Sequence, residues 1–250
     1  MLPRRFLFLK STLKKLSNLF LDAIFPWQCV NCEKESLNPY PLCRECFEKI
    51  PINSFFICPA CGKRIPSLKN CSCRQRKKIS ALGVVSSYEN QIIKKLIFAF
   101  KYQSIISVQT PLSFLIKKFL DSSCFFKDLD KEKTVVIPVP LHKIKRRQRR
   151  FNQAELLAKK VAIDFSFSYS EKAVIKIKNN PPQAKIKHPE ARKENIKNTF
   201  KVIRKEEIKN KIVILVDDVY TTGATMEEIA NILKDAGAKK IIGLVLASGG

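Results

Sequence analysis

The sequence predicts an α/β fold in which a sheet of mostly parallel strands is flanked by helices and preceded by a cysteine-rich segment. Eight of the nine cysteines lie between Cys29 and Cys73, whereas from residue 79 apolar runs of strand length alternate with amphipathic stretches of helix length. Such alternation is typical of a parallel sheet. We therefore expect an N-terminal helix over 1–25, a cysteine-rich domain over 26–78 and an α/β domain over 79–250.

The N-terminal segment is expected to be an amphipathic helix over residues 4–25. Its apolar stripe, spaced by three and four residues, consists of Phe6, Leu9, Leu13, Leu16, Phe20 and Ile24, with basic residues off the stripe. Such a helix either docks on its own protein, which we favour, or lies on an anionic membrane. No run reaches the roughly 18 apolar residues of a membrane span, and no secretory signal is evident. A cytoplasmic location is therefore expected, with peripheral attachment to the inner membrane as a further hypothesis.

The cysteines are spaced as two metal-binding quartets. A C-x-x-C turn aims two thiolates at one ion, and two turns complete a tetrahedron. In a reducing compartment this favours metal over disulfides, so we expect two structural Zn²⁺ sites. The second site ends in Cys71-Ser72-Cys73, one residue shorter than the usual turn, and is the less regular of the two. The expected ligands are Cys29, Cys32, Cys43 and Cys46 for the first ion, and Cys58, Cys61, Cys71 and Cys73 for the second.

The elements of the α/β domain follow from the pattern of apolar residues. Strands are expected over 81–88, 135–139, 174–177, 199–203, 212–216 and 241–246, and helices over 91–101, 111–120, 154–161 and 225–236. The run Ile212–Val216 is apolar throughout, as expected of a central parallel strand, and Gly237 is suited to end the last helix.

The most informative segment runs from Val213 to Thr225. An apolar strand leads into Asp217 and Asp218, then into a loop of small residues, then into a helix. Ligands of α/β sheets bind at the carboxyl ends of strands, and loop amides at a helix N-terminus suit a phosphate. Two acids beside a phosphate site would repel a bare anion, whereas ribose hydroxyls and a metal ion would interact favourably with both acids. The pattern therefore indicates a sugar phosphate.

This segment resembles the phosphoribosyl pyrophosphate signature of type I phosphoribosyltransferases. The chain as a whole resembles the ComF (GntX-like) family of competence and DNA-utilisation proteins. The resemblance rests on both cysteine quartets, Phe100-Lys101-Tyr102, Pro138-Val139-Pro140-Leu141, Phe151-Asn152-Gln153-Ala154, Pro181-Pro182-Gln183, Arg192, Asn195 and the signature itself. It implies a type I phosphoribosyltransferase-like parallel sheet preceded by a double zinc ribbon.

The resemblance also implies roles for individual residues. Asp217 and Asp218 would hold the ribose hydroxyls and Mg²⁺, and the turn around Pro140, Leu141 and His142 would meet the pyrophosphate. Lys101 would also bind phosphoribosyl pyrophosphate. The 5′-phosphate would be held by Tyr220, Thr221, Thr222, Gly223, Ala224 and Thr225. Residues 178–195, with Gln183, Arg192 and Asn195, resemble a flexible loop that closes over such sites and excludes water.

The chain departs from the family pattern at two places. Arg149-Arg150 stands where Arg-Gly is common before Phe-Asn-Gln. Before the Pro-Gln of the loop, where the family often has Arg or Thr, this chain has Lys178, Asn179 and Asn180. Arginine lacks the backbone freedom of glycine, so a different turn is expected at Arg150.

The charge of the chain favours anionic partners. Its formal net charge is +25, and a basic surface attracts nucleic acid, anionic lipid or phosphorylated molecules. A dense basic run follows the expected pyrophosphate turn and consists of Lys143, Lys145, Arg146, Arg147, Arg149 and Arg150. These residues are candidates for binding pyrophosphate or a nucleic-acid backbone; the alternative is a solvated basic face.

Two functions are therefore expected. The first is an enzyme that uses phosphoribosyl pyrophosphate with Mg²⁺ and transfers the phosphoribosyl group to a nitrogen acceptor by positioning and charge stabilisation. The alternative is a protein without catalysis that binds single-stranded DNA during DNA uptake at the cytosolic membrane face, beside the uptake machinery. The sequence identifies neither the acceptor nor the oligomeric state.

Overall fold

The computed structural model describes residues 27–36, 40–66, 71–73, 77–123, 126, 128–180 and 195–249. The chain divides into two compact units, residues 1–49 and 50–250. The helix expected over residues 4–25 lies outside the described residues. In the first unit, β1 (Trp27–Gln28) pairs antiparallel with β2 (Glu35–Ser36), and α2 (Arg44–Glu48) follows. None of the helices described combines the length and apolar character that crossing a membrane requires.

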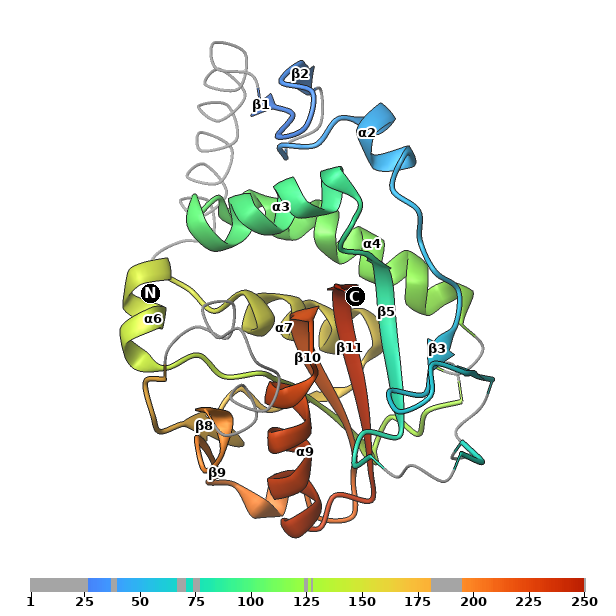
Figure 1. Cartoon of the computed structure of the whole chain (residues 1–250), viewed down its shortest axis with the longest axis vertical. Coiled ribbons are helices and arrows are strands. Elements are labelled where there is room, and N and C mark those ends of the chain that lie inside the picture. The colour runs from blue at the N-terminus through green and yellow to red at the C-terminus, as the bar shows by residue number, and fades with distance from the viewer. Residues whose placement is uncertain are drawn as a thin grey trace, which may run out of the picture. The chain divides into compact units, whose positions relative to one another are not determined.

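The second unit is built on a seven-stranded sheet with the order β4-β3-β5-β11-β10-β6-β7 (Figure 1). Its strands are β3 (Phe56–Ile57), β4 (Arg64–Ile65), β5 (Ala81–Ser87), β6 (Thr134–Pro138), β7 (Ser168–Tyr169), β10 (Ile212–Tyr220) and β11 (Lys240–Ser248). The five strands from β5 to β7 are parallel, whereas β3 and β4 run antiparallel at one edge. The expected α/β parallel sheet is confirmed, with an antiparallel edge in addition.

The strand β10 lies in the interior of this sheet, between β11 and β6. Val213, Ile214, Leu215 and Val216 are all buried, as expected for a strand with both faces covered. The strand continues past its expected end at Val216, because Asp217, Val219 and Tyr220 pair with β11. The two acids therefore belong to the strand and are held by its ladder.

Helices cover both faces of the sheet (Figure 1). The helices α3 (Gln91–Tyr102), α4 (Gln109–Ser122), α7 (Gln153–Phe165) and α9 (Ala224–Asp235) match the four expected ones, each with slightly different ends. On one face, α4 packs on α7, and α7 contacts β6 and β10. On the other, Val213 and Leu215 share a core with Met226, Ile229 and Leu233 of α9.

Several elements differ from, or add to, those expected from the sequence. The strands β8 (Val174–Lys176) and β9 (Phe200–Val202) form, but they pair with each other in a separate antiparallel sheet. The basic run forms a helix, α6 (Lys143–Arg149). Strand β3, which directly precedes Cys58, pairs with β5, so the second cysteine motif lies in the same compact unit as the sheet. The short 3-10 helices are η1 (Ile106–Val108) and η3 (Lys205–Glu207).

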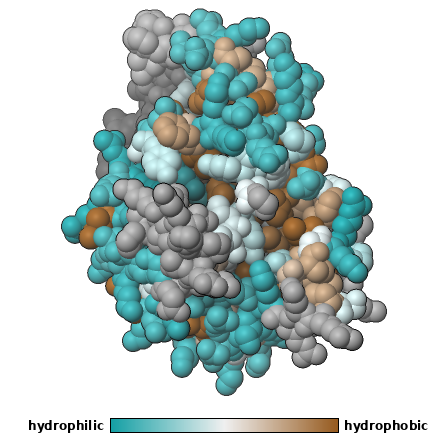
Figure 2. All heavy atoms as spheres, in the orientation of Figure 1, coloured by the Kyte–Doolittle hydropathy of each residue, from teal (hydrophilic) through white to brown (hydrophobic). Residues whose placement is uncertain are grey.

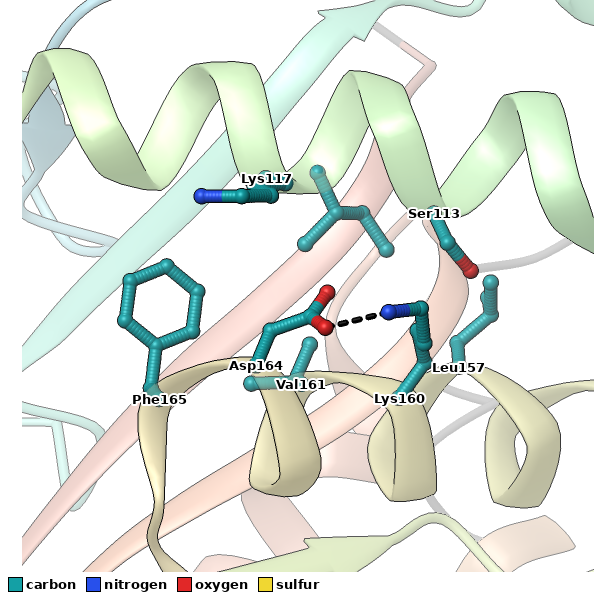
Figure 3. A pocket seen from close by; sticks show the side chains of 8 residues that line it. Ser113, Lys117, Leu157, Lys160, Val161, Asp164 and Phe165 are labelled. Carbon is teal, nitrogen blue, oxygen red and sulfur yellow. Dashed lines mark hydrogen bonds and ion pairs between the residues drawn. The ribbon is translucent and has the colours of Figure 1, made fainter.

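Side chains fill the groove between α4 and α7 (Figure 3). The groove is lined by Lys117, by Phe165 and by Lys160, which forms an ion pair with Asp164. This groove is a packed helix interface rather than a ligand site. On the visible face of the molecule hydrophilic side chains predominate, and apolar ones gather in smaller areas (Figure 2).

Candidate functional site

The loop after β10 forms a hollow at the carboxyl end of the sheet. Its lining consists of Asp217, Val219, Tyr220, Thr221, Thr222, Gly223, Ala224, Thr225 and Met226. Helix α9 begins at Ala224, so its first amide groups border the hollow, and Thr222 Oγ1 accepts a hydrogen bond from the Ala224 N–H at 3.4 Å. Free amides and the positive end of a helix dipole suit an anion.

Gly223 is required by the shape of this loop. Its φ of +75° is in the left-handed region, and an added Cβ would lie 2.1 Å from the Tyr220 hydroxyl. That hydroxyl is buried and has no hydrogen-bond partner among the described residues, and burial followed by the charge of Glu227 raises the pKa of Tyr220 to about 12. Tyr220, one of the residues expected to hold phosphate, thus lines the hollow with its hydroxyl close to Gly223.

The two acids of β10 have different environments. Asp218 Oδ1 lies 2.7 Å from Lys101 Nζ of α3, and both side chains are largely buried. Asp217 lines the hollow instead, and its Oδ1 accepts the Asp218 N–H at 2.8 Å. Burial and the neighbouring charge of Asp218 raise the pKa of Asp217 to about 7, against the opposing effect of Lys101.

Lys101 remains charged in this environment. Burial lowers its pKa, but the attraction of Asp218, and then of Asp217, outweighs burial, so the pKa of Lys101 is raised. The structure thus brings together three residues that the sequence placed in the site: Lys101, Asp217 and Asp218.

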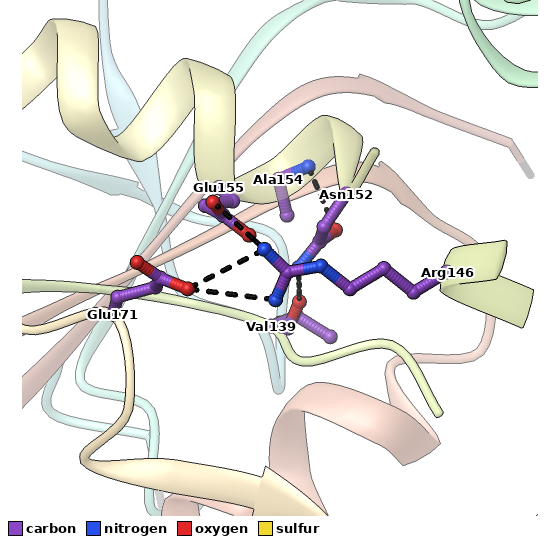
Figure 4. Close-up of polar contacts among 6 residues, drawn as sticks. All are labelled: Val139, Arg146, Asn152, Ala154, Glu155 and Glu171. Carbon is purple, nitrogen blue, oxygen red and sulfur yellow. Dashed lines mark hydrogen bonds and ion pairs between the residues drawn. The ribbon is translucent and has the colours of Figure 1, made fainter. Parts of the chain in front are cut away.

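The expected pyrophosphate turn follows β6, the strand beside β10. Val139 donates its N–H to Val216 O at 2.8 Å, and its carbonyl accepts from Asn152 Nδ2 at 3.0 Å. Asn152 also caps α7 by accepting the Ala154 N–H, so one side chain fixes the turn and the helix together (Figure 4). Leu141 and His142 are half-buried at this end of the sheet, and His142 Nδ1 caps α6 by accepting the Ile144 N–H at 3.4 Å.

Helix α6 presents two different faces. Lys145 and Arg149, one turn apart, are half-buried, while Lys143, Arg147 and Arg150 are exposed. Arg149 lies over the Tyr102 ring at 5.4 Å and donates to Gln153 Oε1 at 3.3 Å. Burial and the charge of Arg149 lower the pKa of Lys145.

Arg146 is engaged by carboxylates. It forms ion pairs with Glu155 of α7 at 3.1 Å and with Glu171 at 3.4 Å (Figure 4). This residue was expected among the nucleic-acid candidates, but in the structure its charge is compensated and it ties α6 to its neighbours.

Lys176 of β8 is a residue that the sequence reasoning missed. It is half-buried with its Nζ 5.4 Å from the Phe200 ring centre. Burial and the charge of Lys145 lower its pKa to about 8, against the attraction of Asp217. Lys145, Arg149 and Lys176 form no ion pair with any residue that the structure describes. One lysine in a lysine-rich chain carries no motif, so only its place in the fold could identify it.

The expected flexible loop is described only at its ends. Gln183 and Arg192 lie outside the described residues. Asn195 is described, and its carbonyl accepts a hydrogen bond from Asn180 Nδ2, while the same amide donates to Thr199 Oγ1 at 3.3 Å. The two ends of the segment 181–194 are therefore tied together.

Each cysteine quartet forms a compact cluster. The four Sγ atoms of each set, Cys29, Cys32, Cys43, Cys46 and Cys58, Cys61, Cys71, Cys73, lie within 4.8 Å of one another. The Cys32–Cys43 and Cys58–Cys73 sulfur distances of 3.7 Å exceed a disulfide bond of about 2.05 Å and fit thiolates around one Zn²⁺ ion.

The two quartets share one turn geometry. Cys29 accepts the Glu33 N–H and donates to Lys34 O, and Cys58 likewise accepts the Gly62 N–H and donates to Lys63 O. Glu33 and Gly62 both have positive φ. Burial raises the pKa of the Cys29 thiol, but hydrogen bonds from the backbone of Cys32, Cys43 and Asn31 outweigh burial and lower this pKa to about 6.

Two family models match the chain. The double zinc ribbon domain matches residues 20–75, and the phosphoribosyl transferase domain matches residues 152–250. Among solved structures, the allosteric regulatory enzyme of purine biosynthesis has a TM-score of 0.38 and 21% identity, with 59% of this chain and 29% of that chain covered.

Two named relatives match over most of the chain, and a third over less than half. Competence protein F of Haemophilus influenzae is 27% identical, covering 87% of this chain and 95% of the relative. Competence protein ComFC of Bacillus subtilis is 29% identical, covering 78% and 79%. The DNA utilization protein YhgH of Escherichia coli K12 is 30% identical over 42% of this chain and 45% of the relative. The chain is therefore a homologue of the ComF competence proteins, and within it the match to the double zinc ribbon domain precedes the match to the phosphoribosyl transferase domain.

Proposed function

We propose that the chain binds phosphoribosyl pyrophosphate with Mg²⁺ and transfers the phosphoribosyl group to a nitrogen acceptor. The observation that carries this proposal is the position of Asp217, which lines the same hollow as the loop Tyr220–Thr225. A carboxylate beside a phosphate cradle suits a ligand that has both an anionic group and hydroxyls or a metal ion.

The 5′-phosphate would lie in the hollow. The amides at the start of α9 would donate to its oxygens, and Thr221, Thr222 and Thr225 would add hydroxyl donors. Because Gly223 has no Cβ, the backbone there would approach the ligand closely.

The ribose hydroxyls and Mg²⁺ would be held by the two acids. Burial, and then the charge of Asp218, raises the pKa of Asp217, so a cation at this position would stabilise the carboxylate. Asp218 would share its charge between Lys101 and the ligand. Mg²⁺, when bound, would neutralise charge on the pyrophosphate as it leaves.

The pyrophosphate would be held by Lys145, Arg149 and Lys176, with Lys101 and the turn at Leu141 and His142. Lys145, Arg149 and Lys176 are half-buried cations that have no carboxylate partner among the described residues. Their charges repel one another, and an anion bound between them would offset this repulsion. In the transfer, the bond from ribose C1 to the pyrophosphate oxygen breaks and a bond to the acceptor nitrogen forms. The leaving group takes the electron pair, and the acceptor loses a proton. The protein would contribute position and positive charge.

The first experiment is calorimetric titration of phosphoribosyl pyrophosphate with Mg²⁺ into the wild type and the Asp217→Ala/Asp218→Ala variant. We expect binding to the wild type only, with equal zinc content in both proteins. Equal affinity of the two proteins would refute the site. Pyrophosphate release that depends on an added nitrogen acceptor would then establish transfer.

A second function, single-stranded DNA binding in competence, has its own observation. The outer face of α6 exposes Lys143, Arg147 and Arg150, and Tyr102 is 64% exposed beside Arg149. Cations with an exposed ring suit a single strand. The relatives are named competence and DNA utilization proteins, which favours a role in competence. As part of this proposal, the chain would act in DNA uptake at the cytoplasmic face of the membrane, near the uptake machinery. Three results would support this function: DNA binding falls as salt is raised, it is lost in the Lys143→Gln/Arg147→Gln/Arg150→Gln variant, and it survives in the Asp217→Ala/Asp218→Ala variant. Binding unaffected by the triple change would exclude this face.

A further inference from the structure

The segment that follows the second cysteine quartet is attached to α9. This helix begins in the loop Tyr220–Thr225, which is proposed to hold the phosphate and is called the phosphate loop below. The backbone N–H of Lys78, five residues after Cys73, donates to Glu227 Oε1 at 2.7 Å. Glu227 lies in the first turn of α9, the helix that begins directly after Gly223. A hydrogen bond to a carboxylate is stronger than one between neutral groups.

Both ends of the second quartet are built into the sheet. Before Cys58, Phe56 and Ile57 of β3 pair with Gly83 and Leu82 of β5. After Cys73, Ile79 is buried in the core that contains Met226, and the Ser80 N–H donates to Ile241 O at 2.8 Å. The chain segment that carries the second quartet is therefore held at both ends by the sheet domain, through Phe56–Ile57 before it and Ile79–Ser80 after it.

Glu227 also contacts the loop itself. Its N–H donates to the Gly223 carbonyl at 2.9 Å. The Tyr220 ring lies beneath Gly223, and the Tyr220 hydroxyl and Glu227 Oε2 are both buried without a hydrogen-bond partner in the described part of the chain. A displacement of the first turn of α9 would therefore move the groups that surround the proposed phosphate.

We propose that the second cysteine quartet, with its metal bound, positions the phosphate loop through the Lys78–Glu227 hydrogen bond, and that Glu227 is a positioning residue. This inference rests on the proposed sugar-phosphate site. The first quartet belongs to the other compact unit and provides a matched control for general effects of metal loss.

The test compares Glu227→Ala, Glu227→Gln and Glu228→Ala by amide hydrogen exchange at residues 221–225 and by titration with phosphoribosyl pyrophosphate and Mg²⁺. Glutamine keeps an oxygen that accepts the Lys78 N–H, whereas alanine does not. Glu228 is the adjacent acid, and it accepts the Asn198 N–H instead. We expect Glu227→Ala to raise exchange and weaken binding about tenfold. Glu227→Gln and Glu228→Ala should stay within about twofold of the wild type.

A second pair of variants tests the metal. Cys61→Ser and Cys32→Ser should each lower zinc content by one ion, and only Cys61→Ser should raise exchange at residues 221–225. The proposal is overturned if Glu227→Ala or Cys61→Ser leaves this exchange unchanged, or if Glu228→Ala or Cys32→Ser raises it equally. Absence of phosphoribosyl pyrophosphate binding by the wild type would refute the proposed function, and the exchange measurements would still decide the coupling.

Discussion

Lys101 Nζ of α3 lies 2.7 Å from Asp218 Oδ1 at the carboxyl end of β10, and both side chains are at least four-fifths buried. One of the two acids is thus paired within the protein, while Asp217 faces the hollow of the phosphate loop. The pair joins a helix at one side of the site to the strand at its centre.

Lys101→Met should destabilise the fold, because Asp218 would remain buried without its cation. We expect the free energy of unfolding in urea to fall by about 3 kcal/mol. The matched control is Lys117→Met, which breaks the Lys117–Asp121 pair of 2.6 Å in which both side chains are about half exposed; its cost should be below about 1 kcal/mol. Similar costs for the two variants would contradict the buried character of the Lys101 pair.

Asp217→Asn should change how stability depends on pH. The ordinary pKa of the group is 3.8, and burial together with the Asp218 charge raises it to about 7 in the folded chain. Between these values the folded state holds more protons than the unfolded state, so this carboxyl makes stability fall as pH rises. The asparagine variant lacks this contribution. It should gain about 4 kcal/mol relative to the wild type between pH 4 and pH 8, at about 1.4 kcal/mol for each pKa unit, measured by urea unfolding without Mg²⁺. A constant difference across this range would contradict the raised pKa.

Arg150→Gly should stabilise the protein. Arg150 ends α6 with a φ of 68°, in the left-handed region that glycine adopts without strain. We expect a gain of about 0.5–1 kcal/mol in the free energy of unfolding. Arg147→Gly, within the same helix, is the control and should cost about 1 kcal/mol. A lower free energy of unfolding in Arg150→Gly would show that contacts of the arginine side chain stabilise the fold by more than its left-handed backbone destabilises it.

The case of Arg150 also indicates how far the sequence could predict the structure. The sequence predicted a different turn at Arg150, because arginine stands where glycine is common, but it could not predict that Arg150 adopts a left-handed φ. It predicted the run Ile212–Val216 as a central strand because an uninterrupted apolar run needs two covered faces. The strand continues to Tyr220 because Asp217 and Val219 pair with β11, and long-range pairing leaves no local signal.

The site was predictable to the extent that it follows from one continuous motif. Asp217, Thr222 and Gly223 lie together because they are neighbours in the chain. The separate environments of Asp217 and Asp218 depend on Lys101, which belongs to a distant helix. Likewise, the basic run of α6 divides into an inner face, with Lys145 and Arg149, and an outer face only once the helix is docked.

Lys176→Gln tests the part of the site that no motif indicated. Lys176 is half-buried, its pKa is lowered to about 8 by burial and by Lys145, and it forms no ion pair with a described residue. If it contacts the pyrophosphate, its loss should weaken binding of phosphoribosyl pyrophosphate about tenfold, because a charge-assisted contact disappears. Affinity for ribose 5-phosphate, which lacks the pyrophosphate, should stay within about twofold. Lys178→Gln, an exposed lysine of the same segment, should change neither affinity. If Lys176→Gln weakens binding of both ligands equally, this lysine attracts anions in general and does not contact the pyrophosphate specifically.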